Sequence, residues 1–231
     1  MKGAGVGLEK LKGKIVVAGF HGIGFVGFIA VDFMVRKLGT RRVDWYFNRN
    51  LPAVVFAGKG RLEMPVEFYT KDKLGFMKIS VMAERDVLNE VLEDNVAAMK
   101  KAGAKALIVI GGLASNKASR GALFGISNAK GERLMEKMKL KPLDKEITVF
   151  GPMASALIYG ERAGLPVVCL LSEASSSLPD PKAASKAIKH LSEIFGFELN
   201  TKDLEKDAKK VEKRIKELDK KEDPLRDRMF V

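Results

Sequence analysis

Residues 14–39 read KIVVAGFHGIGFVGFIAVDFMVRKLG and contain the alternation that decides the fold class. Residues 14–20 form a short apolar run that passes through a glycine, which is typical of a buried strand. From Gly24 to Leu38 the apolar residues follow helical spacing, and Gly39 stands where a helix commonly ends. This stretch therefore predicts a strand, a tight turn and a helix in immediate succession.

The same alternation continues along the chain. Residues 105–112 (KALIVIGG) and 166–171 are apolar enough for strands that are covered on both faces. Residues 66–70 and 76–81 predict a hairpin, so part of the sheet should be antiparallel. We therefore expect a three-layer α/β/α fold with a mixed, mostly parallel sheet. The other predicted strands are residues 43–48, 53–57 and 146–150, and the other predicted helices are residues 85–101, 131–139, 153–163 and 181–195.

The composition changes near Asn200, after which most residues are charged or helix-forming. Apolar residues from Leu204 to Leu218 repeat at spacings of four and three over about two heptads, which predicts a charged amphipathic helix. Such a helix could dock on the domain, pair between subunits or project outward. Pro224 should end it. We expect a flexible N-terminus over residues 1–13, an α/β domain over 14–200, the helix over 201–223 and a mobile tail over 224–231.

Composition limits the functional classes. Lys and Arg number 41 against 29 Asp and Glu, a net charge of +12, yet the lysines are spread along the chain without a dense basic stretch. A nucleic-acid partner is therefore not favoured. Glutamine is absent and 30% of residues are charged, which is typical of a hyperthermophile surface. The sequence has no apolar run long enough for a membrane span, and its one cysteine, Cys169, excludes an internal disulfide, so we expect a cytoplasmic protein.

Gly22, Gly24 and Gly27 match the spacing of a dinucleotide-binding turn between a strand and a helix. The acidic residue that should end the next strand is missing, since Asp44 lies at that strand's beginning. A tight turn with close backbone packing is therefore the favoured interpretation, and we expect no bound cofactor. The only histidines, His21 and His190, are far apart and have no partners at metal-ligand spacing, so we expect no metal site.

Gly111 and Gly112 end the apolar strand that starts at Lys105, at the edge where parallel sheets bind ligands. Ser115 and Lys117 beside them could hold an anion, although no glycine–lysine phosphate-binding motif accompanies them. Glu173 follows another apolar strand and could bind a ligand at the rim of the sheet or cap a loop. An ordinary loop is the favoured interpretation for both segments.

The last three residues, Met229, Phe230 and Val231, place apolar side chains at the end of a charged segment. Burying a Phe or Met side chain stabilises a complex by about 1.5–3 kcal/mol. A free carboxylate could in addition pair with a lysine of a receiving pocket. These residues therefore predict either a docking motif for a partner or a terminus that folds back on its own domain.

Six segments of the chain form a recognisable series when they are taken in order. They are residues 19–27 (GFHGIGFVG) and 29–31 (IAV), 110–112 (IGG), 151–154 (GPMA), 164–174 (GLPVVCLLSEA) and 179–184 (PDPKAA). Together they resemble the proteasome assembly chaperone family in its archaeal branch. The resemblance implies an α/β domain akin to the nucleoside phosphorylase and peptidyl-hydrolase type, used without catalysis and assembled into homo-oligomers.

Proteasome activators and assembly factors are similar in ending with a hydrophobic–tyrosine–any tail, which enters a pocket between neighbouring α-subunits and sets its carboxylate against a lysine. The resemblance assigns the hydrophobic position to Met229, the aromatic position to Phe230 and the carboxylate to Val231. Phe in place of Tyr loses a hydroxyl and a hydrogen bond of about 1 kcal/mol.

The sequence thus predicts an ATP-independent assembly chaperone or activator that docks several tails on the α-ring of the proteasome. Two alternatives stay open. The first is a small-molecule or nucleoside-handling enzyme, with the Gly22–Gly27 turn, Ser115 and Glu173 around its site. The second is an oligomeric scaffold that recruits another small protein.

Overall fold

The computed structural model describes residues 7–58, 61–115, 121–143, 146–176, 178–204 and 206. The helices are α1 (Val26–Lys37), α2 (Arg85–Lys101), α3 (Glu132–Lys137), α4 (Pro152–Ala163) and α5 (Pro181–Phe195), with short 3-10 turns at Leu8–Leu11, Ile23–Phe25 and Ala129–Gly131. The strands are β1 (Ile15–Gly19), β2 (Arg41–Tyr46), β3 (Phe56–Gly58), β4 (Arg61–Glu63), β5 (Val66–Lys71), β6 (Leu74–Ile79), β7 (Ala106–Ala114), β8 (Leu123–Ser127), β9 (Lys141–Pro142) and β10 (Val167–Ala174).

Eight of these strands form one mixed sheet in the order β2-β5-β6-β1-β7-β10-β8-β9. The centre is parallel, because β1 pairs with β6 and β7, and β7 pairs with β10, all in the same direction. Antiparallel pairs flank this centre. Strand β5 forms a hairpin with β6, β2 runs antiparallel to β5, and β8 runs antiparallel to β10. The strands β3 and β4 form a separate two-stranded ribbon. The mixed, mostly parallel sheet predicted from the sequence is confirmed.

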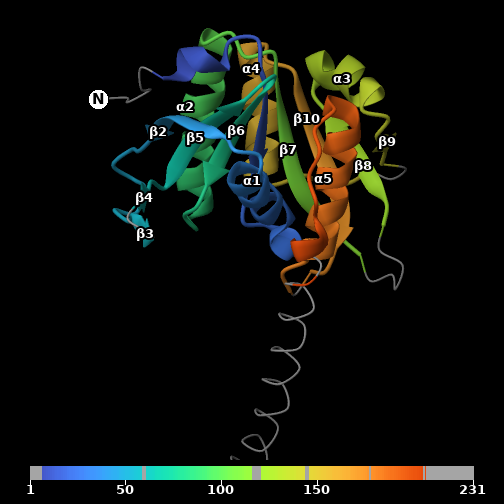
Figure 1. Cartoon of the computed structure of the whole chain (residues 1–231). Helices are drawn as coiled ribbons and strands as arrows, with labels where there is room; N and C mark the ends of the chain where they lie inside the picture. The colour runs from blue at the N-terminus through green and yellow to red at the C-terminus, as the bar shows by residue number, and fades with distance from the viewer. Residues whose placement is uncertain are drawn as a thin grey trace, which may run out of the picture.

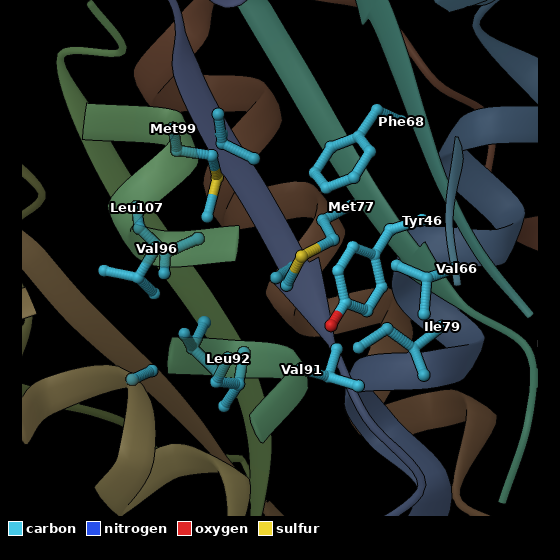
Figure 2. Close-up of a cluster of buried hydrophobic side chains, with 14 of the residues drawn as sticks. Tyr46, Val66, Phe68, Met77, Ile79, Val91, Leu92, Val96, Met99 and Leu107 are labelled. Carbon is cyan, nitrogen blue, oxygen red and sulfur yellow. The ribbon is translucent and has the colours of Figure 1, made fainter. Parts of the chain in front are cut away.

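Helices cover both faces of this sheet, as Figure 1 shows: α1 and α5 lie on one side, and α2 and α4 lie on the other. Each face buries its own apolar core. In the core under α2, side chains such as Phe68 and Met77 of the sheet meet Leu92 and Met99 of the helix (Figure 2). Close packing of large side chains on both faces explains the continuous apolar strands of the sequence.

Helix boundaries follow local signals that the sequence carries. The Asp180 side chain accepts a hydrogen bond of 3.0 Å from the backbone N–H of Ala183 and caps α5, whose first residue is Pro181. Gly196 ends the same helix with a φ of 69°, a conformation that glycine adopts without strain. The bounds of α2 and α5 agree with the predicted ranges.

The prediction of a strand over residues 146–150 is wrong. This segment has no strand structure, and the place beside β10 is taken by β8, which the sequence analysis missed. Two apolar residues of the segment are instead exposed, Ile147 at 44% and Phe150 at 69%. The strand predicted over residues 53–57 is only partly present, because β3 begins at Phe56 and ends at Gly58.

The folded domain extends beyond the predicted limits of 14 and 200. Leu8 and Leu11 are buried in the core under α2, and both belong to the segment that the sequence analysis placed outside the domain. At the other end, Thr201 and Leu204 are buried, and residues 202–204 are helical. The rest of the predicted helix over 201–223, from residue 207 on, and the tail over 224–231 lie outside the described residues. Among the residues described, none of the helices combines the length and the apolar run that a membrane crossing would need.

Candidate functional site: a cavity at the carboxyl ends of the parallel strands

A half-enclosed cavity of about 380 Å³ lies at the carboxyl ends of β1, β7 and β10, between the turn after β1 and the start of α4. This is the edge where open α/β sheets bind ligands. The lining is predominantly apolar. It consists of Phe20, His21, Gly22, Ile23, Gly27, Ala83, Arg85, Leu88, Ile110, Gly111, Gly112, Leu113, Ile126, residues 147–153 and Leu171.

Glycines at the inner wall of the cavity let backbone segments touch. A Cβ atom on Gly27 would lie 2.2 Å from the carbonyl oxygen of Ile110, and one on Gly112 would lie 2.2 Å from that of Ile23. A Cβ atom on Gly111 would meet the terminal methyl group of Met153 at 2.1 Å. Close packing of strand, turn and helix therefore accounts for these glycines without a bound phosphate.

The turn before α1 uses its backbone amides internally. The N–H of Phe25 donates to the carbonyl of Gly22 at 2.8 Å, and the N–H of Phe28 donates to that of Phe20 at 3.2 Å. Gly24 and Phe25 both have left-handed backbone conformations, with φ values of 61° and 49°. These amides are therefore not directed at a pyrophosphate, as a dinucleotide site would require.

His21 lies in the wall of the cavity between aromatic rings. Its ring stacks on Phe28, with centroids 4.0 Å apart, and meets the ring of Phe25 edge-on at 5.6 Å. Burial lowers the pKa of His21 below its ordinary value of 6.5. The imidazole is therefore neutral at neutral pH and adds a polar but uncharged group to the site.

Arg85, the first residue of α2, is the only lining residue among those described that carries a charge at neutral pH. Its guanidinium carbon lies 6.0 Å from the centroid of the Phe150 ring. Contacts of this kind are attractive and favour arginine. Within the described part of the chain, Arg85 has no carboxylate within ion-pair distance.

Four of the glycines singled out in the sequence, Gly22, Gly27, Gly111 and Gly112, do line this cavity. Gly24 instead lies against Ala174 and Asp180, where a Cβ atom would have contacts of 3.0 and 3.2 Å. The sequence analysis missed Arg85 and Phe150, because their place at the cavity depends on segments that are far apart in the chain.

Ser115 and Glu173 do meet, but outside the cavity lining. The Ser115 hydroxyl donates to Glu173 Oε1 at 3.3 Å, and the backbone N–H groups of Gly121 and Ala122 donate to Oε2 at 3.2 Å each. The carboxylate therefore binds the loop before β8, which is the capping role that the sequence analysis favoured over a ligand contact. Lys117 lies outside the described residues.

The described residues hold no group of three or more potential metal ligands. His190, on α5, contacts the carbonyl oxygen of Met138 at 2.7 Å. Cys169 is fully buried in β10, and burial raises the pKa of its thiol far above its ordinary value. Neither residue takes part in the cavity.

Comparison with known families matches the PAC2 family over residues 16–219, which includes every residue that lines the cavity. The chain belongs to the PAC2 family. A protein of Methanocaldococcus jannaschii known as MJ0106 is 25% identical to this PAC2 chain over 205 residues, which cover 88% of the chain and 84% of that protein.

Solved structures share this PAC2 fold. Pyrococcus furiosus PbaA, described as an archaeal homologue of proteasome-assembly chaperone, superposes with a TM-score of 0.79 at 24% identity and covers 94% of this chain and 92% of its own. Pyrococcus furiosus PbaB, described as an archaeal proteasome activator, has a TM-score of 0.74 at 20% identity, with 90% and 94% covered.

A second region of the PAC2 chain buries charges instead of apolar groups. Lys78 of β6, 4% exposed at its side chain, forms ion pairs with Asp32 of α1 at 3.1 Å and with Glu63 of β4 at 2.6 Å. Burial by itself would lower the pKa of Lys78, but the hydrogen bond to Glu63 and the charge of Asp32 outweigh burial and raise it. The ammonium group is therefore charged and tied to two elements.

Next to this lysine, the fully buried Glu67 of β5 accepts a bond of 2.7 Å from Arg42 of β2 and one of 2.6 Å from the Tyr69 hydroxyl. Arg42 also donates to the carbonyl of Leu62 at 2.9 Å. The hydrogen bond with Glu67 raises the pKa of Arg42. We call Asp32, Arg42, Glu63, Glu67, Tyr69 and Lys78 the ribbon network, because these side chains bind the β3-β4 ribbon to the sheet.

The same edge exposes large apolar side chains. Strand β2 ends the eight-stranded sheet, and Figure 1 shows β3 and β4 beside it. Apolar patches of this kind commonly mark contacts between proteins. We call the following residues, each 36–53% exposed, the edge patch: Trp45, Phe47, Val54, Val55, Phe56 and Leu62.

Proposed function

We propose that this PAC2 protein is a cytoplasmic, ATP-independent proteasome-binding assembly chaperone or activator that works as a homo-oligomer. The observation that carries the proposal is the family match over residues 16–219, together with a fold shared over nine-tenths of the chain with PbaA and PbaB. The names of those two proteins point to proteasome assembly and proteasome activation. The proposal transfers that class of partner, the proteasome, to this chain.

In this proposal the terminal residues Met229, Phe230 and Val231 dock in pockets of the α-ring. The two apolar side chains would be buried there, and the carboxylate of Val231 would pair with a lysine of the pocket. A single tail should bind weakly, because ordering it offsets most of the gain. Several tails on one oligomer raise the overall affinity by about 10²–10⁴.

Self-association in the proposal uses the edge patch. Trp45 and Val55 are 47% and 51% exposed, and β2 presents an open strand edge. Exposed edges and apolar patches are normally covered in native proteins. In this proposal a second copy of the chain covers the edge patch. The resulting oligomer carries several C-terminal tails, which the higher overall affinity requires.

A non-catalytic role agrees with the chemistry of the cavity. Its described lining contains one imidazole, one guanidinium and the Thr148 hydroxyl, but no carboxylate and no thiol. The enzyme alternative would need Ser115 and Glu173 in the cavity. These two side chains are instead hydrogen-bonded to each other outside its lining. Nucleophilic catalysis requires a nucleophile and a base within hydrogen-bond reach, and among the described residues no hydrogen bond joins the Thr148 hydroxyl to His21.

The docking proposal is tested by pulling down proteasome α-ring with four versions of the protein. The full-length chain should retain the ring, and a version that stops after Arg228 should lose it. Phe230→Tyr should bind about fivefold more tightly, because a phenolic hydroxyl can add a hydrogen bond of about 1 kcal/mol. Leu225→Ala, another apolar tail residue, serves as the control and should bind like wild type. Equal retention by the truncated protein would rule out tail docking.

Oligomerisation is tested separately by light scattering during size-exclusion chromatography. Trp45→Asp together with Val55→Asp should reduce the particle to a monomer, because a carboxylate in a buried interface core is costly. Ile158→Asp places the same charge on another exposed apolar residue, 62% exposed on α4, and should leave the mass unchanged. Dissociation by Ile158→Asp alone would move the interface to α4.

A further inference from the structure

We propose that the cavity is a binding site for a small apolar molecule with one negative charge, such as an aromatic or aliphatic carboxylate, and that Arg85 recognises the charge. This inference goes beyond the proteasome-related role and does not depend on it. It rests on four properties of the cavity: its size, its lining, its single cation and its exposed rim.

The size and the lining suit a small molecule. A volume of about 380 Å³ falls in the range of ligand pockets, which is roughly 300–1,000 Å³. Phe20, Leu88, Ile110 and Leu171 line it with apolar side chains from four different segments. Such sites bind mainly by burying apolar surface, while a few polar groups fix the ligand's orientation.

The charge of the site favours an anion. Arg85 is the one charged residue in the described lining, and its guanidinium contacts the Phe150 ring. An aromatic ring does not use up the five N–H donors of a guanidinium, so these remain for a carboxylate. The lining residues described include neither aspartate nor glutamate, so nothing there compensates the charge.

The same lining disfavours a nucleoside. Recognition of base edges and ribose hydroxyls relies on amide or carboxylate side chains, and the described lining contains no Asp, Glu, Asn or Gln. The side chains able to form hydrogen bonds there are His21, Arg85 and Thr148. His21 is neutral, so it can donate one hydrogen bond to the ligand or accept one, but it adds no second charge.

The rim offers apolar surface that a ligand would cover. Ile147 and Phe150 are 44% and 69% exposed on the segment before α4, and Ile23 is 37% exposed on the opposite turn. Gly151, with a φ of 71°, joins this segment to α4. An apolar molecule between the two sides would remove these side chains from water.

The test uses three probes of the same shape: naphthalene-2-carboxylate, 2-naphthylmethanol and 2-naphthylmethylammonium. Isothermal titration calorimetry of the full chain at pH 7.5 should show the carboxylate binding at least about tenfold more tightly than the ammonium, since charge-assisted hydrogen bonds are the strong ones. Acetate, which has the charge without the apolar body, should not bind measurably. Acetate thereby controls for the protein's overall charge of +12.

Two variants locate the site. Arg85→Ala should weaken the carboxylate about tenfold and leave the alcohol unchanged. Arg133→Ala removes an exposed cation of α3 outside the cavity and should change neither. Ala83→Trp should fill the cavity and abolish binding of all three probes, with an unchanged melting temperature showing that the variant folds. Equal binding of the three probes, or carboxylate binding that survives Arg85→Ala or Ala83→Trp, would overturn the proposal.

Discussion

The ribbon network and the cavity lie at different places on the same sheet and differ in how their charged side chains are placed, because Glu67 and Lys78 are buried whereas Arg85 is exposed. In the ribbon network, Glu67 and Lys78 are removed from water, and each has two partners, at least one of which comes from another element. In the cavity, Arg85 faces apolar walls and an aromatic ring without a carboxylate among the described residues. Buried charges with partners fix one arrangement of the chain, whereas a cation without one leaves binding capacity for a ligand.

The largest expected effect comes from breaking the ribbon network. Arg42→Ala should lower the free energy of unfolding by about 3–4 kcal/mol, because it leaves the fully buried Glu67 carboxylate with the Tyr69 hydroxyl as its remaining bond. Urea denaturation followed by circular dichroism measures this loss. Arg41→Ala, at an exposed neighbouring position of β2, should cost less than about 0.5 kcal/mol. If both variants lost a similar free energy of unfolding, the buried Arg42–Glu67 pair would contribute no more to stability than an exposed arginine.

A somewhat smaller effect is expected at the cavity wall. Gly27→Ala should cost about 2–3 kcal/mol, because its Cβ atom would lie 2.2 Å from the Ile110 carbonyl oxygen and the backbone would have to move. Gly22→Ala, at a position with nothing within 4 Å of the added Cβ, should be nearly neutral. The two melting temperatures give the comparison. A neutral Gly27→Ala would show that the close approach to the Ile110 carbonyl does not constrain this position.

These glycines belong to the part of the fold that could be predicted from the sequence. The strand, turn and helix over residues 14–39 were predictable because apolar periodicity and glycine positions are local signals. The bounds of α2 and α5 were predictable for the same reason, with Asp180 and Gly196 marking the ends of α5. The interpretation of Gly22–Gly27 as a tightly packed turn agrees with the contact of Gly27 with Ile110.

What the sequence could not provide depends on tertiary pairing. Residues 146–150 have the composition of a strand, but they pair with no described strand, and both edges of β10 are already paired with β7 and β8. Arg42 and Glu67 are neighbours only because β2 and β5 align in one register. The cavity likewise joins segments around residues 21, 85, 111 and 150, whose distances in space no local pattern encodes.

Two buried serines allow the same comparison for uncharged side chains, because Ser185 has a hydrogen-bond partner and Ser172 has none among the described residues. Ser185→Ala should cost about 1 kcal/mol, because Ser185 donates a bond of 2.8 Å to the buried Thr201 hydroxyl. Ser172→Ala should be neutral or slightly stabilising, since the Ser172 hydroxyl is buried without a hydrogen-bond partner among the described residues. Thermal unfolding of both variants under the same conditions ranks them. Equal destabilisation would indicate that Ser172 has a partner beyond the described part of the chain.

The smallest expected effect concerns the histidine of the cavity and appears only as a pH dependence. Burial lowers the pKa of His21 in the folded protein, while the unfolded chain keeps a value near 6.5. Between these two values the unfolded state binds the proton and the folded state does not, so stability should fall as the pH drops below 6.5. His21→Phe should keep the aromatic contacts with Phe25 and Phe28 and lose this component.

The difference in melting temperature between wild type and His21→Phe should be constant above pH 7 and change by on the order of 1 °C between pH 6.5 and 5, because a partly exposed imidazole is only partly desolvated. Scanning calorimetry at several pH values measures the difference, from which titrations common to both proteins cancel. His190→Phe, which removes the other histidine, should leave the pH dependence assigned to His21 in place. If the difference changed in the opposite direction, with wild type gaining stability at low pH, the cavity would favour a charged imidazole, and the anion site would then rest on two cations instead of Arg85 alone.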